Sequence, residues 1–107
     1  MRRKFEPFDK KIIRREILSL SSQDHKRLTV AMKAYQLDLG VGYKLKNYGN
    51  QIEMLTDSGD GQGRCIFFTR SPERLIVLLI YKKESQKIPA SILEITRARL
   101  RRFITNE

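Results

Sequence analysis

The chain has 107 residues and carries 22 lysines and arginines against 12 aspartates and glutamates, a formal net charge of +10. This length suits one modest core, so we expect a single domain over residues 1–107. The charge favours polyanionic partners through counterion release, and the lone cysteine excludes an internal disulfide.

Secretion and membrane insertion are not expected. The basic residues at the start are followed by no apolar stretch of the signal-peptide type. The longest apolar run, residues 75–81, is too short to span a bilayer. Cys65 lies in an apolar segment, which predicts a buried reduced thiol and a cytoplasmic location.

Two helices are predicted after a short edge strand or extended arm at residues 5–8, where Pro7 argues against a central strand. Residues 9–20 carry isoleucines and leucines that suit one buried helical face. The Ser21-x-x-Asp24 spacing is typical of the next helix start. An apolar stripe continues to Leu39, and Gly40 can end the helix. We expect an antiparallel helical hairpin.

The apolar period then changes to that of strands. Residues 51–56 place Ile52 and Met54 on one face, and residues 57–63 form a flexible turn. Residues 64–70 and 75–81 are apolar on both faces, which indicates central strands of an antiparallel meander. Pro89 can open a last helix that runs to about residue 104. The predicted fold is α+β, with the helical hairpin packed on a small twisted antiparallel sheet and a C-terminal helix.

Arg64 begins a central strand and shares a face with Ile66 and Phe68. A buried arginine is costly unless it is paired or reaches a cleft. Two interpretations are therefore open. The guanidinium binds a phosphate group, or it forms a salt bridge with Glu53 on the neighbouring strand.

Three lysines follow the last strand: Lys82, Lys83 and Lys87. They either anchor phosphates or are solvated turn residues. Tyr81, beside them, can stack on an unpaired base or simply pack at the rim of the core. His25 is the only histidine, and its surroundings show no spacing typical of a metal site or a thiol protease, so we expect no metal and no cofactor.

Three segments carry a family resemblance: Gly63-Arg64-x-Ile66-Phe67-Phe68, Ile76-Val77-Leu78-Leu79-x-Tyr81-Lys82-Lys83-x-x-Gln86-Lys87-x-Pro89, and Ile92-x-x-x-Thr96-x-Ala98-Arg99. Together with the helices that precede the sheet, they resemble the RelE/HigB/ParE toxin superfamily, most closely its phage-derived RelE-like branch. The resemblance covers nearly the whole chain.

The resemblance implies a toxin of a type II toxin–antitoxin pair that cuts mRNA on the ribosome without a metal, by attack of the ribose 2′-hydroxyl. Its partners are then a cognate antitoxin and ribosome-bound mRNA. Arg64 matches the strand arginine that stabilises the scissile phosphate. The implied catalytic residues are Arg64, Lys83 and Lys87, and the implied RNA-binding residues are Tyr81, Lys82 and Arg99.

The chain departs from well-studied nucleases of this superfamily at two places. Glu53 and Leu55 stand where the second strand carries lysine or arginine, and the late tyrosine or histidine has no counterpart. Proton transfer then falls to Lys83, Lys87, Tyr81 or Glu53. Two alternatives stay open: a gyrase-poisoning toxin, and a catalytically inactive nucleic-acid-binding protein of the same fold.

An antitoxin commonly lays a helix or an extended arm across its toxin. Met32, Tyr35 and the arm at residues 5–8 are candidate docking positions. For Met32 and Tyr35, core packing is the preferred interpretation.

Overall fold

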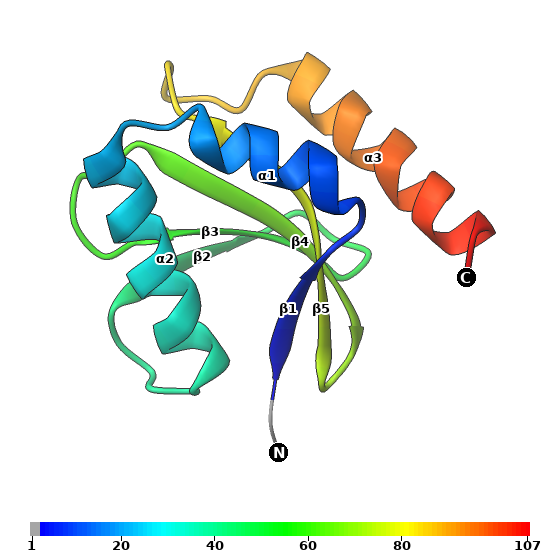
Figure 1. The fold of residues 1–107 in the computed structure, drawn as a ribbon, viewed down its shortest axis with the longest axis horizontal. Coiled ribbons are helices and arrows are strands. Elements are labelled where there is room, and N and C mark those ends of the chain that lie inside the picture. Colours follow the sequence, from blue (N-terminus) through cyan, green and yellow to red (C-terminus); the bar gives the residue numbers. More distant parts are fainter. Residues whose placement is uncertain (1–2) are drawn as a thin grey trace.

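The computed structural model describes residues 3–107, which form three helices and one five-stranded sheet (Figure 1). In chain order the elements are β1 (Lys4–Pro7), α1 (Lys10–Leu18), α2 (Ser22–Gln36), β2 (Tyr43–Asn47), β3 (Ile52–Asp57), β4 (Gly63–Ser71), β5 (Arg74–Lys82) and α3 (Ala90–Thr105). The strands lie in the order β1-β5-β4-β3-β2. Only β1 runs parallel to its neighbour, and the other pairs are antiparallel.

Helices cover both faces of the sheet. On one face, core residues of α1 and α2 pack against the strands, among them Ile13 and Leu28. On the other face, Ile92, Leu100 and Phe103 of α3 pack against a second apolar cluster. Figure 1 shows α1 crossing β5 and α2 descending beside β2 and β3. The central strands β4 and β5 are therefore apolar on both sides, as predicted.

The predicted α+β class, the helical pair and the C-terminal helix are confirmed. The three-stranded antiparallel meander is incomplete, because the sheet is mixed and has five strands. The arm at residues 5–8 contributes the edge strand β1, where Phe5 lies opposite Leu75. The strand β2 was not predicted, and it forms the other edge of the sheet.

Side-chain caps fix the starts of the first two helices. The Asp9 carboxylate accepts a 3.1 Å hydrogen bond from the Ile12 amide, and the Ser21 hydroxyl accepts one of 3.1 Å from the Asp24 amide. The predicted start of α2 is thus confirmed. Its last helical residue is Gln36, earlier than predicted, because Asp38 already adopts a left-handed conformation with φ of 58°.

A bulge between β4 and β5 decides which face Tyr81 occupies. Ile66 lies opposite Leu79, whereas Phe67 lies opposite Val77, so Leu78 is an extra residue in β5. Such a bulge reverses the alternation of side chains along a strand. Tyr81 consequently lies on the face that α3 covers, directly opposite Arg64.

No helix within residues 3–107 has both the length and the apolar character needed to cross a membrane.

Candidate functional site

Four side chains form a row across the sheet, one from each of β2, β3, β4 and β5. Lys44 lies opposite Thr56, and Arg64 lies opposite Tyr81. A 2.8 Å hydrogen bond from Arg64 to the Thr56 hydroxyl joins the two halves of the row. Tyr81 packs in the apolar cluster to which α3 contributes, so the row lies on the sheet face that this helix covers.

A cavity of about 220 Å³ lies over this row. It opens into a wider depression of about 780 Å³ above the turn between β3 and β4. We call the two together the groove. The cavity is lined by Lys44, Leu45, Lys46, Tyr48, Met54, Thr56, Arg64, Tyr81, Lys83, Ser85, Gln86 and Ile88. The depression adds residues 59–62, Lys82 and Glu84.

One nitrogen of Arg64 is fully engaged by the protein. Its Nη1 atom donates to the Thr56 hydroxyl at 2.8 Å and to the carbonyl oxygens of Gly61 at 2.7 Å and Gly63 at 3.0 Å. The salt bridge with Glu53 considered from the sequence is wrong. Glu53 lies opposite Phe67, whose ring belongs to the core on the other face of the sheet.

The turn that carries these carbonyls is held from several sides. The Asp57 carboxylate accepts hydrogen bonds from the amides of Gly59 at 3.0 Å and Gly61 at 3.4 Å. A side chain at Gly61 would collide with this carboxylate. The Gln62 carbonyl accepts a 2.7 Å hydrogen bond from the Lys83 amide. The turn therefore fixes Arg64 and also ties the end of β5 beside it.

Tyr81 presents a neutral phenol to the groove. The side chain is half-buried, and its hydroxyl lies 3.4 Å from the sulfur of Met54. Burial raises the pKa of Tyr81 above its usual value; nearby Tyr48 raises it further, and the Arg64 charge lowers it. A phenol in this state can donate a hydrogen bond or a proton, but it is a poor base.

The three lysines predicted for the site occupy different places relative to the groove. Lys83 is half-buried and lines both parts of the groove, whereas Lys82 is exposed and lines only the depression. Lys87 is exposed and lies outside both linings. The structure thus brings Arg64, Tyr81, Lys82 and Lys83 together and leaves Lys87 at the margin.

Arg99 lies elsewhere. Its guanidinium pairs with Glu16 of α1 at 2.7 Å and donates to the Leu78 carbonyl at 2.9 Å. Glu16 in turn accepts a 3.0 Å hydrogen bond from the Ile80 amide. Together, Arg99 and Glu16 clamp the bulged part of β5, just after the residues of β5 that pair with β1. We therefore leave Arg99 out of the RNA-binding residues proposed below.

The predicted docking positions belong largely to the core. Tyr35 is buried, and its ring centroid lies 5.4 Å from that of Phe67. Met32 packs against the same cluster. Phe5 meets Phe67 edge-on at 5.3 Å. Core packing is therefore the role that the structure gives to Met32 and Tyr35.

Sequence reasoning missed the second wall of the groove, which β2 supplies. Lys44 donates a 3.3 Å hydrogen bond to the Gly59 carbonyl, and Lys46 lies 5.5 Å from the ring centroid of Tyr48. Lys44 and Lys46 thus place cations on β2, whereas the neighbouring strand β3 carries the acidic residue Glu53. The alternating run Tyr43-Lys44-Leu45-Lys46 was the available signal for an edge strand.

Comparison with known proteins places this architecture in a family. A model of the family described as phage derived protein Gp49-like (DUF891) matches residues 15–101, which include every residue that lines the groove. The chain belongs to this Gp49-like family, part of the RelE/ParE-like toxin superfamily. No curated protein matches the chain. The toxin superfamily predicted from the sequence is thereby confirmed.

Proposed function

We propose that this chain is the toxin of a type II toxin–antitoxin pair and that it cuts mRNA on the ribosome. The observation that carries the proposal is the row across the sheet. It sets an immobilised arginine opposite a half-buried tyrosine, in a groove with lysines on two sides. Toxin character is what the Gp49-like family supports, and RNA cleavage is our extension from the groove.

The groove suits an unpaired RNA strand. Tyr48 and Tyr81 offer aromatic faces for base stacking. Lys44 and Lys46 border one side of the groove, and Lys83 borders the other. Lysines on both sides of aromatic residues are the arrangement that single strands require, because the bases stack while the phosphates meet positive charge. Lys82 and Lys87 then contact phosphates that flank the cut.

The reaction needs no group beyond the RNA and the protein. The ribose 2′-oxygen attacks the adjacent phosphorus, and a new P–O bond forms as the bond to the 5′-oxygen breaks. The products are a 2′,3′-cyclic phosphate and a free 5′-hydroxyl. One proton leaves the 2′-hydroxyl and another is delivered to the 5′-oxygen.

Arg64 stabilises the charge that develops on the phosphate. Its Nη1 is committed to protein acceptors, while Nε and Nη2 have no hydrogen-bond partner within residues 3–107. Those two nitrogens form one edge of the guanidinium, which can bind two phosphate oxygens together. Because the protein already fixes the group, little reorganisation is needed during the reaction.

Proton transfer falls to the residues nearest Arg64. Glu53 faces the opposite side of the sheet and cannot take part. Tyr81 carries a protonated phenol and serves as a hydrogen-bond donor toward the leaving oxygen; burial raises the pKa of Tyr81 further above its ordinary value. Lys83, half-buried in the lining of the cavity, places its ammonium beside the attacking 2′-oxygen and stabilises the charge that develops there as the proton leaves to solvent water.

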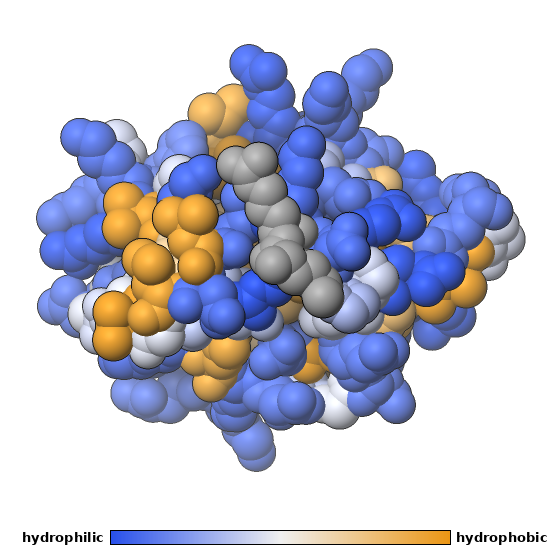
Figure 2. All heavy atoms as spheres, turned by 90° about the horizontal axis from the view of Figure 1, so that it is seen from below, coloured by the Kyte–Doolittle hydropathy of each residue, from blue (hydrophilic) through white to orange (hydrophobic). Residues whose placement is uncertain are grey.

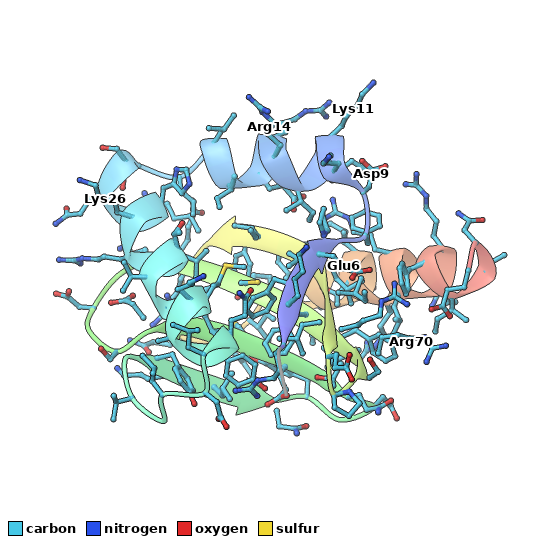
Figure 3. All side chains as sticks on the ribbon, turned by 60° about the horizontal axis from the view of Figure 1, so that its bottom comes forward. Glu6, Asp9, Lys11, Arg14, Lys26 and Arg70 are labelled. Carbon is cyan, nitrogen blue, oxygen red and sulfur yellow. The ribbon has the colours of Figure 1, made fainter. Side chains whose placement is uncertain are left out.

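Induced expression with and without the neighbouring gene tests this function. We expect growth arrest with new mRNA ends inside translated frames, and rescue by a co-encoded antitoxin. Arg64→Ala should abolish both effects. Arg70→Ala is the matched control, because Arg70 lies at the far end of the same strand (Figure 3). Its guanidinium pairs with Glu107 and not with a residue of the groove.

Three outcomes would argue against the proposal. Full toxicity of Arg64→Ala would remove the role of that residue. An SOS response without mRNA cleavage would indicate a gyrase poison. Salt-sensitive RNA binding with neither product nor toxicity would indicate a binding protein only.

A further inference from the structure

A second group of cations lies away from the groove, on the outer face of α1. Its members are exposed and form no ion pair with a carboxylate within residues 3–107: Lys10, Lys11, Arg14 and Arg15. Figure 3 shows Lys11 and Arg14 extending from α1 away from the sheet. Hydrophilic side chains also cover most of the face seen in Figure 2. We call these four residues the α1 basic face.

The acidic residues of this region are already engaged. The Asp9 carboxylate caps α1 through the Ile12 amide and pairs with Arg102 of α3 at 3.2 Å. Glu16 pairs with Arg99 and accepts from the Ile80 amide. The outer face of α1 therefore carries charge of one sign only.

Arg15 lies in the last turn, where a cation suits the helix dipole, but the other features of this arrangement work against the stability of the helix. The first turn of α1 holds no acidic residue, and Lys10 and Lys11 lie there, at the positive end of the helix dipole. Lys10 with Arg14, and Lys11 with Arg15, form two like-charged pairs four residues apart, a spacing that brings them together on the helix surface. Stable helical surfaces intersperse both signs. Local choices that oppose stability indicate a functional surface.

We propose that the α1 basic face binds the phosphate backbone of double-helical nucleic acid, separately from the groove. The face offers charge but no aromatic side chain, because α1 reads KKIIRREIL. Single strands are held by stacking in a groove, whereas a duplex presents phosphates to a convex cationic surface. The chemistries of the two surfaces are thus different.

The two surfaces also lie on different sides of the molecule. Ile13 of α1 packs in the core cluster on one face of the sheet. Tyr81, in the lining of the groove, packs in the cluster on the face that α3 covers. One nucleic acid segment can therefore occupy the groove while a double-helical segment contacts α1. The proposal does not depend on RNA cleavage.

The test compares two variants of the full chain with equal loss of charge. In the first, Lys10, Lys11, Arg14 and Arg15 are all changed to glutamine. In the control, glutamine replaces four exposed cations elsewhere: Lys4, Lys33, Arg97 and Arg101. Binding to a labelled RNA hairpin stem, and to a DNA duplex of equal length, is measured by fluorescence anisotropy over a salt series.

We expect the first variant to bind at least about tenfold more weakly than the wild type. The slope of log affinity against log salt should fall by about 0.9 for each phosphate that the four side chains neutralise in the wild type. The control should lose less than about threefold in affinity. Equal loss of affinity for RNA and DNA supports recognition of the phosphate backbone, and a larger loss for RNA supports recognition of the A-form backbone.

The first variant should also melt no lower than the wild type, because like-charge repulsion within α1 is removed.

Other results would overturn the proposal. Equal weakening in both variants would show an effect of net charge alone. An unchanged affinity of the first variant would remove the site. Binding to anionic phospholipid vesicles is measured in parallel. If the first variant binds the vesicles more weakly but binds both nucleic acids as the wild type does, the face would belong to a membrane surface. Arg64→Ala should keep duplex binding, and failure of that variant to bind the duplex would contradict two separate surfaces.

Discussion

Arg64 on β4 donates a 2.8 Å hydrogen bond to the hydroxyl of Thr56 on β3, across the floor of the groove. Two backbone carbonyls of the preceding turn accept from the same nitrogen. The guanidinium is therefore oriented before any ligand arrives, and the side chain that orients it can be changed without altering the charge of the site.

Thr56→Val keeps the shape of the side chain and removes the acceptor. Because the two carbonyls remain, we expect RNA cleavage to slow by about fivefold, which corresponds to about 1 kcal/mol, with little change in melting temperature. Single-turnover cleavage and a thermal melt measure the two quantities. Thr56→Ser should restore the rate, and a valine variant as fast as the wild type would contradict the positioning role of the hydroxyl.

The clamp on β5 gives a prediction about stability. Arg99 and Glu16 are only 19% and 21% exposed, so removing one partner leaves a poorly solvated charge. We expect Arg99→Met to lower the free energy of unfolding by about 2–3 kcal/mol. Denaturant unfolding measures it. Arg102→Met, which removes a more exposed pair, should cost much less. Equal losses in the two variants would be inconsistent with a clamp.

Local patterns predicted most of the frame. The apolar stripe around Leu28 defined α2, and the doubly apolar runs defined β4 and β5. The alternation of side chains along a strand also predicted that Arg64 lies on the same face as Ile66, which the structure confirms. It placed Glu53 on the face opposite Met54, and the pairing of Met54 with Ile66 in the structure shows that this is also the face opposite Arg64.

Features that depend on distant parts of the chain could not be predicted. The strand β2 is mostly exposed and has only Leu45 as an aliphatic residue, so its pairing with β3 decides its conformation. The bulge at Leu78 is invisible in a uniformly apolar run. The partner of Arg99, Glu16, lies 83 residues away in the sequence.

Tyr81 should remain protonated at pH values at which an ordinary tyrosine ionises. Burial raises its pKa above the ordinary value of 10.0. Tyrosinate absorbance is followed over a pH titration in the wild type and in Tyr81→Phe. We expect the part of the signal that the variant lacks to titrate above pH 10. Because the folded pKa is the higher one, the stability contributed by Tyr81 is present below pH 10 and is lost as the pH rises above it. A missing signal centred below pH 10 would contradict the burial of the phenol.

Cys65 should be inert in the folded protein. Its side chain is fully buried in the core, and burial raises the pKa of the thiol. We expect a maleimide at pH 8 to label Cys65 no faster than the chain unfolds, and to label it at once in denaturant. Mass spectrometry follows the modification. Rapid labelling under native conditions would show that β4 is accessible.

The central claim is that the groove around Arg64 cuts mRNA through the ribose 2′-hydroxyl. The most direct measurement adds purified protein to ribosomes that carry an mRNA with either a normal ribose or a 2′-deoxyribose at the mapped cut site. We predict that only the normal message is cut, with a 2′,3′-cyclic phosphate at the new end. Arg64→Ala should slow the cut at least about a hundredfold, and Arg70→Ala should leave it unchanged. Cleavage of the deoxy message, or Arg64→Ala cutting at the wild-type rate, would contradict the claim.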